Sequence, residues 1–141
     1  ENLKVRALAL GLSDERISEV LTMVQLTSTG KKKAGQFSLG MKQRLGIALA
    51  LLAQPKLLIL DEPTNGLDPI GIQDLRKLIR SFSAKGITVI LSSHILSEVE
   101  LIADHIGIIS NGKLGYEGEF HKDVDLEHIF MEVVGNTRGE G

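Results

Sequence analysis

The chain has 141 residues, 43% of them hydrophobic, which is enough for one globular domain with a sizeable core. With 16 basic and 18 acidic residues the formal charge is −2, so the overall charge gives no reason to expect nucleic-acid binding. The absence of cysteine excludes disulfides and thiolate metal sites, and it is compatible with a reducing cytosol.

The sequence contains no apolar run long enough to span a bilayer. The longest, IALALLA, covers Ile47–Ala53, whereas a membrane-spanning helix needs about 20 apolar residues. The N-terminus also lacks the basic and then apolar layout of a signal peptide. Because the chain opens at Glu1 within a helical pattern, we expect it to be a fragment of a longer protein.

Residues 1–53 are predicted to be mostly helical. A helix should begin with Ser13 or Asp14 as its N-cap, because apolar residues then recur at helical spacing. These residues are Ile17, Val20, Leu21 and Val24. A second helix should begin near Ser38, and Pro55 stops its pattern.

From Lys56 onward the pattern changes to alternating strands and helices. Leu57–Leu60 is a continuous apolar run, typical of a strand buried on both faces of a parallel sheet. A helix is predicted from about Pro69 to Ala84, with Pro in the first turn, and a second strand over Ile87–Leu91.

The last third should hold a helix, a hairpin and a short final helix. The first helix carries Leu96, Val99 and Ala103, and Asn111-Gly112 predicts a tight turn between strands. A helix over Leu126–Val134 follows. The alternation of strand and helix indicates an α/β class with a parallel sheet.

Three chemically capable side chains follow the two predicted parallel strands. Asp61 and Glu62 come directly after the first strand, and His94 follows the second. Because ligands of open parallel sheets sit at the carboxyl ends of the strands, these side chains can converge on one crevice. Taken singly, each of the three residues is better explained as a polar strand terminus.

Four motifs in chain order make the functional interpretation more specific. FSLGMKQR, LLILDEP, NGLD and SSH begin at Phe37, Leu57, Asn65 and Ser92. Together they resemble the signature motif, Walker B, D-loop and switch histidine of the ATPase domain of ABC transporters. The segment SLGMKQRLGIALALL is most similar to the corresponding segment in ATPase subunits of bacitracin- and lantibiotic-type peptide exporters.

The resemblance implies a role for each site residue in handling ATP and Mg²⁺. Asp61 holds Mg²⁺ through its hydration shell, since Mg²⁺ takes only one or two carboxylates. Glu62 polarises the attacking water, and His94 contacts the γ-phosphate. Ser38 and Gly40, at a helix N-terminus, contact ATP held by an opposite subunit. For Ser38 the simpler role of N-cap stays open.

The resemblance also implies that Asp68 crosses the same interface between two ATPase subunits. In the signature motif, Leu39 replaces a common glycine and Met41 a common glutamine. No G-x-x-x-x-G-K-[ST] phosphate loop occurs in the chain. The expectation is therefore that the intact subunit is an ATPase, and that this segment alone binds ATP weakly and is inactive.

The implied fold is a partial P-loop NTPase domain, with a helix-flanked parallel sheet and an α-helical subdomain. Residues 1–53 should form the helical signature subdomain, and residues 54–141 the C-terminal half of the nucleotide-binding core. The implied partners are a second ATPase subunit, arranged head to tail, and a transmembrane permease. The implied location is cytoplasmic, at the inner face of the membrane. The segment itself is expected to self-associate through its uncovered sheet.

Two other functions remain open at this stage. An ABC-type ATPase of DNA repair or translation would carry long coiled-coil insertions, or a tandem second ATPase head in the full chain. The short spacing from Ser38 to Asp61 leaves no room for an insertion there. A non-enzymatic interaction domain of the same fold is the other alternative. The presence of Asp61, Glu62 and His94 favours an enzyme over that alternative.

Overall fold

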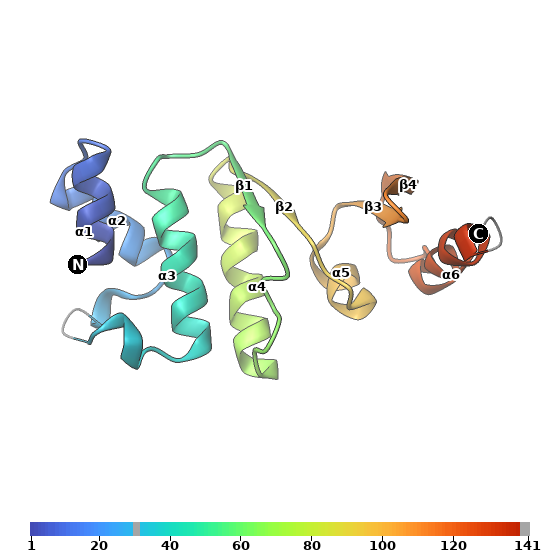
Figure 1. Ribbon diagram of the computed structural model, residues 1–141, viewed down its shortest axis with the longest axis horizontal. Coiled ribbons are helices and arrows are strands. Elements are labelled where there is room, and N and C mark those ends of the chain that lie inside the picture. Colours follow the sequence, from blue (N-terminus) through green and yellow to red (C-terminus); the bar gives the residue numbers. More distant parts are fainter. Residues whose placement is uncertain (30–31, 139–141) are drawn as a thin grey trace. The chain divides into compact units, whose positions relative to one another are not determined.

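A computed structural model describes residues 1–29 and 32–138 of the chain (Figure 1). Gly30 and Lys31, in the predicted break before the second helix, lie outside the described residues. The chain divides into two compact units, Glu1–Ser92 and Ser93–Gly141, and each is described by itself. The expected boundary after residue 53 falls inside the first unit and stays a prediction.

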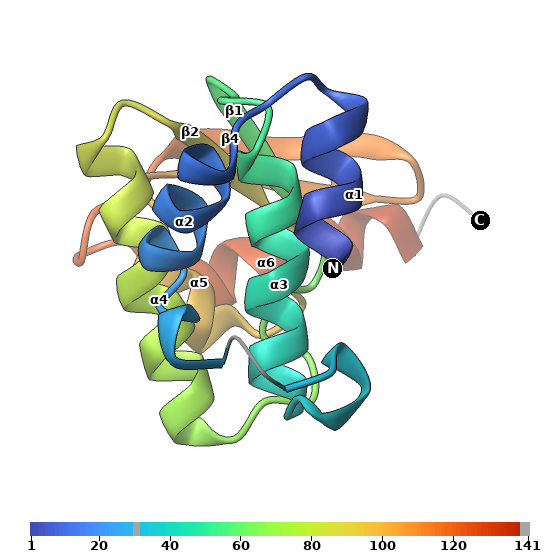
Figure 2. The same cartoon turned by 90° about the vertical axis from the view of Figure 1, so that its left-hand side faces the viewer.

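The first unit combines four α-helices with one pair of strands. The helices are α1 (Asn2–Ala9), α2 (Asp14–Met23), α3 (Leu39–Leu51) and α4 (Pro69–Ala84). Two short 3-10 turns, Thr27–Thr29 and Ala34–Gln36, lie between α2 and α3. The strands are β1 (Leu57–Leu60) and β2 (Thr88–Leu91), on either side of α4 in the sequence. Helix α3 contacts α1, α2 and α4 (Figures 1 and 2).

The helix boundaries follow from capping residues that the sequence displays. Of the two predicted candidates, Ser13 and Asp14, the N-cap residue of α2 is Ser13, although its side chain makes no capping hydrogen bond. Asp14 and Glu15 lie in the first turn, where the helix dipole stabilises negative charge. Ser38 caps α3, and Asp68 caps α4 directly before Pro69. Helix α4 buries one apolar stripe, whose members recur at helical spacing: Leu75, Leu78, Ile79 and Phe82.

Strands β1 and β2 form the predicted parallel pair, in register from Leu57 beside Thr88 to Leu60 beside Leu91. Leu58 and Leu60 point into the core, at 3% and 9% exposure. Ile59 on the opposite face is 69% exposed and its neighbour Ile90 is 53% exposed. The prediction of burial on both faces is therefore wrong for this chain, because its described residues cover only one face of the pair.

The second unit contains α5 (Leu96–Ile102), β3 (His105–Ser110), β4 (Lys113–Glu119) and α6 (Leu126–Arg138). Strands β3 and β4 form the predicted antiparallel hairpin. At its tip, Asn111 and Gly112 have φ angles of 49° and 74°, as a type I′ turn requires. Ile106, Ile108 and Leu126 form the core of this unit. Among the helices of the described residues, none has the length and apolarity needed to cross a bilayer.

Candidate functional site

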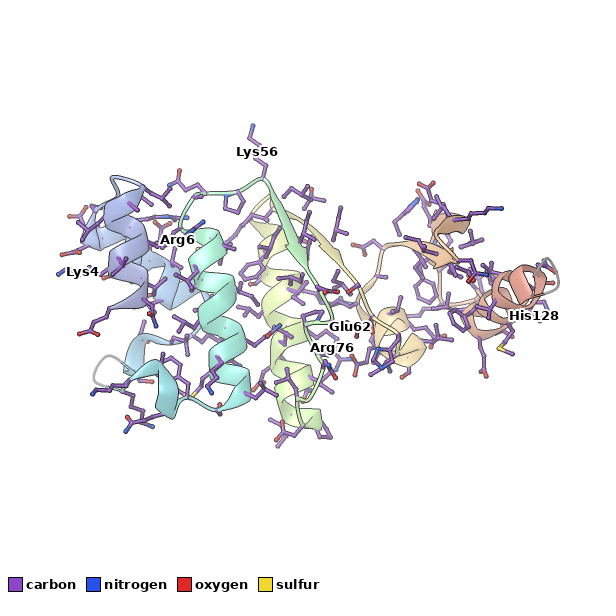
Figure 3. The ribbon with its side chains drawn as sticks, in the orientation of Figure 1. Lys4, Arg6, Lys56, Glu62, Arg76 and His128 are labelled. Atoms are coloured by element: carbon purple, nitrogen blue, oxygen red, sulfur yellow. The ribbon has the colours of Figure 1, made fainter. Side chains whose placement is uncertain are left out.

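The two candidate acids lie where β1 ends, in the first unit. Figure 3 labels Lys56 and Glu62 at the two ends of this strand. The Asp61 side chain is exposed, and Glu62 is half-buried. Because β1 and β2 are parallel and in register, Ser92 follows β2 at the level where Asp61 follows β1. The Ser92 N–H donates to the carbonyl of Leu60 at 3.0 Å, which continues the pairing for one further residue.

The hydroxyl of Ser92 joins the two acidic residues. Its Oγ donates to Asp61 Oδ1 at 2.6 Å. The same Oγ accepts a hydrogen bond from the backbone N–H of Glu62 at 2.8 Å. One hydroxyl therefore engages the side chain of the first acid and the main chain of the second.

The backbone at Glu62 has an unusual conformation. Its φ angle is 45°, in the left-handed region that a residue with a side chain adopts at a cost of about 1 kcal/mol or more. The Glu62 carbonyl then accepts from Asn65 N–H at 3.1 Å, so the chain turns directly after the strand. Strained residues of this kind are concentrated at functional sites, where the surroundings hold them in place.

A separate pocket brings together the three residues assigned by resemblance to ATP contact in trans. It has a volume of about 470 Å³ and lies between the start of α3 and the start of α4. Its lining includes Ser38, Gly40, Arg44, Leu67, Asp68 and Asp74. Ser38 and Asp68, thirty positions apart in the sequence, therefore line the same pocket.

 The two helices that begin at that pocket, α3 and α4, are each capped by the side chain of their own N-cap residue. Ser38 Oγ accepts from the Met41 N–H at 3.2 Å, and Asp68 Oδ1 accepts from the Gly71 N–H at 2.7 Å. A Cβ on Gly71 would lie 2.9 Å from Asp68 Oδ1, so glycine permits this close cap. The simpler role of Ser38 as an N-cap is thus present, and a contact with ATP would be added to it.

The signature segment and the D-loop segment touch each other at this pocket. The Leu39 side chain lies against Gly66, whose φ angle is 77°, and a Cβ at position 66 would come within 2.9 Å of Leu39 Cδ2. Gly40 faces Leu67 in turn. Deeper along the two helices, Arg44 and Asp74 form an ion pair at 3.6 Å. Leu39, which replaces a common glycine of the signature motif, therefore packs on the D-loop segment.

His94 belongs to the second unit and lies in the loop before α5. Its side chain is exposed. The loop is held by a tight turn in which Ser93 Oγ accepts from the Ile95 N–H at 3.1 Å. The expected convergence of His94 with Asp61 and Glu62 joins residues of different units, and it stays a prediction.

The residues present at the end of β1 fit a hydrated magnesium ion. Within residues 1–29 and 32–138, no three His, Asp or Glu side chains gather as a direct metal-binding cluster. Mg²⁺ does not need such a cluster, because it keeps most of its waters and takes one or two carboxylates. Asp61 offers an exposed carboxylate whose orientation is set by Ser92.

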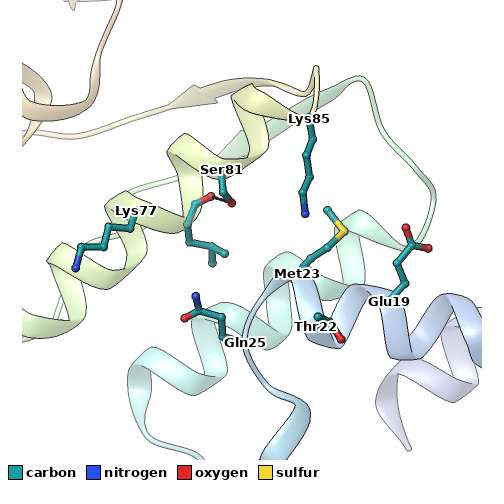
Figure 4. A pocket seen from close by; sticks show the side chains of 8 residues that line it. Glu19, Thr22, Met23, Gln25, Lys77, Ser81 and Lys85 are labelled. Atoms are coloured by element: carbon teal, nitrogen blue, oxygen red, sulfur yellow. Dashed lines mark hydrogen bonds between the residues drawn. The ribbon is translucent and has the colours of Figure 1, made fainter.

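Another pocket of about 480 Å³ lies between the end of α2 and the side of α4 (Figure 4). Its lining includes Glu19, Met23, Gln25, Lys77, Ser81 and Lys85. It contains none of the residues that the sequence motifs single out.

Two parts of the site were not assigned from the sequence. Ser92 is within the SSH motif but received no role, although its place one residue after β2 mirrors that of Asp61 after β1. The contact of Leu39 with Gly66 has no local signal, because the two residues come from segments that meet only in the folded unit.

Comparison with known proteins identifies the family. A family model described as "AAA domain, putative AbiEii toxin, Type IV TA system" matches residues 2–100. The chain is 55% identical over 95% of its length to the lantibiotic transport ATP-binding protein SrtF of Streptococcus pyogenes. It is 59% identical over 81% of its length to the bacitracin transport ATP-binding protein BcrA of Bacillus licheniformis. The chain spans 58% of the former protein and 38% of the latter.

Solved structures give the same result for the fold. An ATP-binding subunit of an ABC transporter matches with a TM-score of 0.75 and 31% identity, over 93% of this chain and 60% of that one. An ATP-binding cassette in its ADP conformation matches with a TM-score of 0.72 and 28% identity, over 88% of this chain and 46% of that one. The chain therefore belongs to the AAA-domain family, and its sequence and fold are those of an ABC-type ATPase.

Proposed function

We propose that this chain supplies the signature, Walker B, D-loop and switch-histidine parts of an ATPase subunit that drives export across a membrane. The observation that carries the proposal is the pair of acids at the end of β1, joined by the Ser92 hydroxyl. The names of the relatives, lantibiotic and bacitracin transport ATP-binding proteins, support export of peptide antibiotics. In this proposal the complete subunit combines this segment with a phosphate-binding loop.

In the proposed mechanism the two acids have separate tasks. Asp61 would hold hydrated Mg²⁺, and the ion when bound would neutralise phosphate charge. Glu62 orients the attacking water and accepts its proton as a general base. Its backbone has a left-handed φ angle of 45°. His94 contacts the γ-phosphate and responds to its loss. Such catalysis consists mainly of positioning and charge stabilisation.

The pocket between α3 and α4 serves a second ATPase subunit in this proposal. Ser38 and Gly40 present the N-terminus of a 13-residue helix, where backbone N–H groups and the helix dipole favour a phosphate. Asp68 lines the same pocket and reaches across the interface of a head-to-tail dimer. A transmembrane permease is the further partner, and the subunit works in the cytoplasm at the inner face of the membrane.

The test is a Glu62→Gln variant of the complete subunit. Because the amide keeps the size of the carboxylate but cannot act as a base, we expect ATP turnover to fall by about 100-fold or more. MgATP binding should be retained, and the nucleotide-bound dimer should become more stable. Turnover is measured by phosphate release, binding by calorimetry, and the dimer by light scattering.

Glu15→Gln, at an exposed position in the first turn of α2, is the matched control and should turn over as the unchanged subunit does. Residues 1–141 alone should show neither turnover nor micromolar MgATP affinity. Normal hydrolysis by Glu62→Gln would remove Glu62 from the mechanism.

A further inference from the structure

We propose that Ser92 is a positioning residue for the reaction: its hydroxyl fixes the directions of both acids at the end of β1. This inference rests on the proposed ATPase function. Ser92 is the residue that directly follows β2, within the same unit as the two acids. Its hydroxyl contacts both Asp61 and Glu62.

The first half of the argument concerns Asp61. A carboxylate on an exposed turn rotates freely about its last side-chain bond. The 2.6 Å hydrogen bond from Ser92 Oγ to Oδ1 restricts that rotation, and Oδ2 would remain available to hydrated Mg²⁺. Mg²⁺ demands near-ideal octahedral geometry. A carboxylate whose orientation is already fixed would therefore bind the hydrated ion at a lower Mg²⁺ concentration.

The second half concerns Glu62. Its left-handed φ of 45° needs a partner that holds the main chain against the strain. Ser92 Oγ supplies this partner by accepting the Glu62 N–H at 2.8 Å. The direction in which the Glu62 side chain leaves the backbone therefore depends on a hydroxyl that comes from the neighbouring strand.

Ser92 is well placed for this task because its own backbone is fixed. The Ser92 N–H donates to the Leu60 carbonyl at 3.0 Å, and the preceding residue, Leu91, pairs with Leu60 in the sheet. The hydroxyl is thus tied to a rigid element rather than to a mobile loop, as precise placement of reacting groups requires.

The experiment compares Ser92→Ala, Ser92→Thr and Ser83→Ala in the complete subunit. Ser83 is exposed near the end of α4 and is the matched control for loss of a hydroxyl. The first measurement is amide hydrogen exchange at Glu62 without nucleotide. Loss of one hydrogen bond should speed exchange about 5-fold in Ser92→Ala, with little change in Ser92→Thr or Ser83→Ala.

The second measurement is ATP turnover as a function of Mg²⁺. We expect Ser92→Ala to lower kcat about 10-fold and to raise the Mg²⁺ concentration for half-maximal rate, with the KM for ATP unchanged. Ser92→Thr retains a hydroxyl, so it should keep most of the kcat and most of the Mg²⁺ dependence of the unchanged subunit. A general loss of stability would instead lower the fraction of active protein and leave the Mg²⁺ dependence as it was.

The outcomes separate this inference from the proposed function. Unchanged exchange at Glu62 in Ser92→Ala, or faster exchange with normal turnover and normal Mg²⁺ dependence, overturns the positioning role while the ATPase assignment stands. Absence of ATPase activity in the unchanged complete subunit overturns the proposed function itself, and the inference with it.

Discussion

At the scale of single residues, the site depends on backbone conformations that few residues adopt. Glu62 and Gly66 both have left-handed φ angles, 45° and 77°, and both lie in the turn between β1 and α4. At Gly66 the absence of a side chain also makes room for Leu39. One short turn thus links the acids at the strand end to the pocket at the helix starts.

Gly66 meets two requirements, a left-handed φ angle and space for the Leu39 side chain, and the variant Gly66→Ala tests both. We expect a loss of about 1–2 kcal/mol in the free energy of unfolding, because alanine is strained at positive φ and its Cβ meets Leu39. Adding Leu39→Ala should recover only the part due to that contact. Chemical denaturation of the single and double variants measures both parts.

Gly46→Ala is the matched control, since a Cβ at Gly46 meets nothing within 4 Å and the residue is in helix α3. It should be neutral or stabilising, because alanine favours a helix. Equal stability of Gly66→Ala and the unchanged chain would contradict the account of this turn.

At the scale of elements, the end of α3 is satisfied by a side chain from another helix. Arg16 of α2 donates from Nη2 to the carbonyl of Leu51 at 2.6 Å, and its Nη1 lies 2.7 Å from Glu19 Oε2. The Arg16 side chain is only 12% exposed. The last carbonyls of α3 lack intrahelical partners, so this guanidinium ties α2 to α3 as well as capping it.

Replacing Arg16 with alanine should therefore destabilise the first unit. The expected loss is about 1.5–3 kcal/mol, the value for a hydrogen bond to a charged group. Thermal or urea unfolding measures it. Arg6→Ala, at an exposed position in α1, is the control and should cost about 0.5 kcal/mol or less. Similar losses in the two variants would refute the capping role.

At the scale of the whole chain, the parallel pair leaves one apolar face uncovered within the described residues. Leu57, Ile59 and Ile90 are 48%, 69% and 53% exposed on that face. Three adjacent aliphatic side chains in water, beside unpaired strand edges, favour association with another copy. Self-association of the segment, expected from the sequence, therefore has a defined surface.

The double variant Ile59→Thr/Ile90→Thr tests that surface. Threonine keeps the strand preference of a β-branched residue and lowers the apolar area, so we expect a smaller mean mass at high concentration. Size-exclusion chromatography with light scattering measures the mass of residues 1–141. Val5→Thr, at a 69% exposed position of α1, is the control and should associate as the unchanged chain does. A monomeric unchanged chain would contradict the prediction.

Much of this molecule was predictable from local sequence. The elements follow from the N-cap candidates Ser13 and Ser38, the turn at Asn111-Gly112 and the alternation of strands and helices, because each depends on neighbours within a few positions. The same local motifs carried the assignment to ABC-type ATPases, with which the relatives and solved structures agree.

Only the tertiary structure decided how distant segments cooperate. The bridge from Ser92 to Asp61 and Glu62, the contact of Leu39 with Gly66 and the exposure of Ile59 all depend on strand pairing and helix packing. The prediction that both faces of β1 are buried is wrong. An apolar run shows that a strand is suited to burial on both faces, but it does not show which elements cover those faces in this chain. Local interactions determine the elements, whereas the orientation of the reacting groups depends on contacts between residues far apart in sequence.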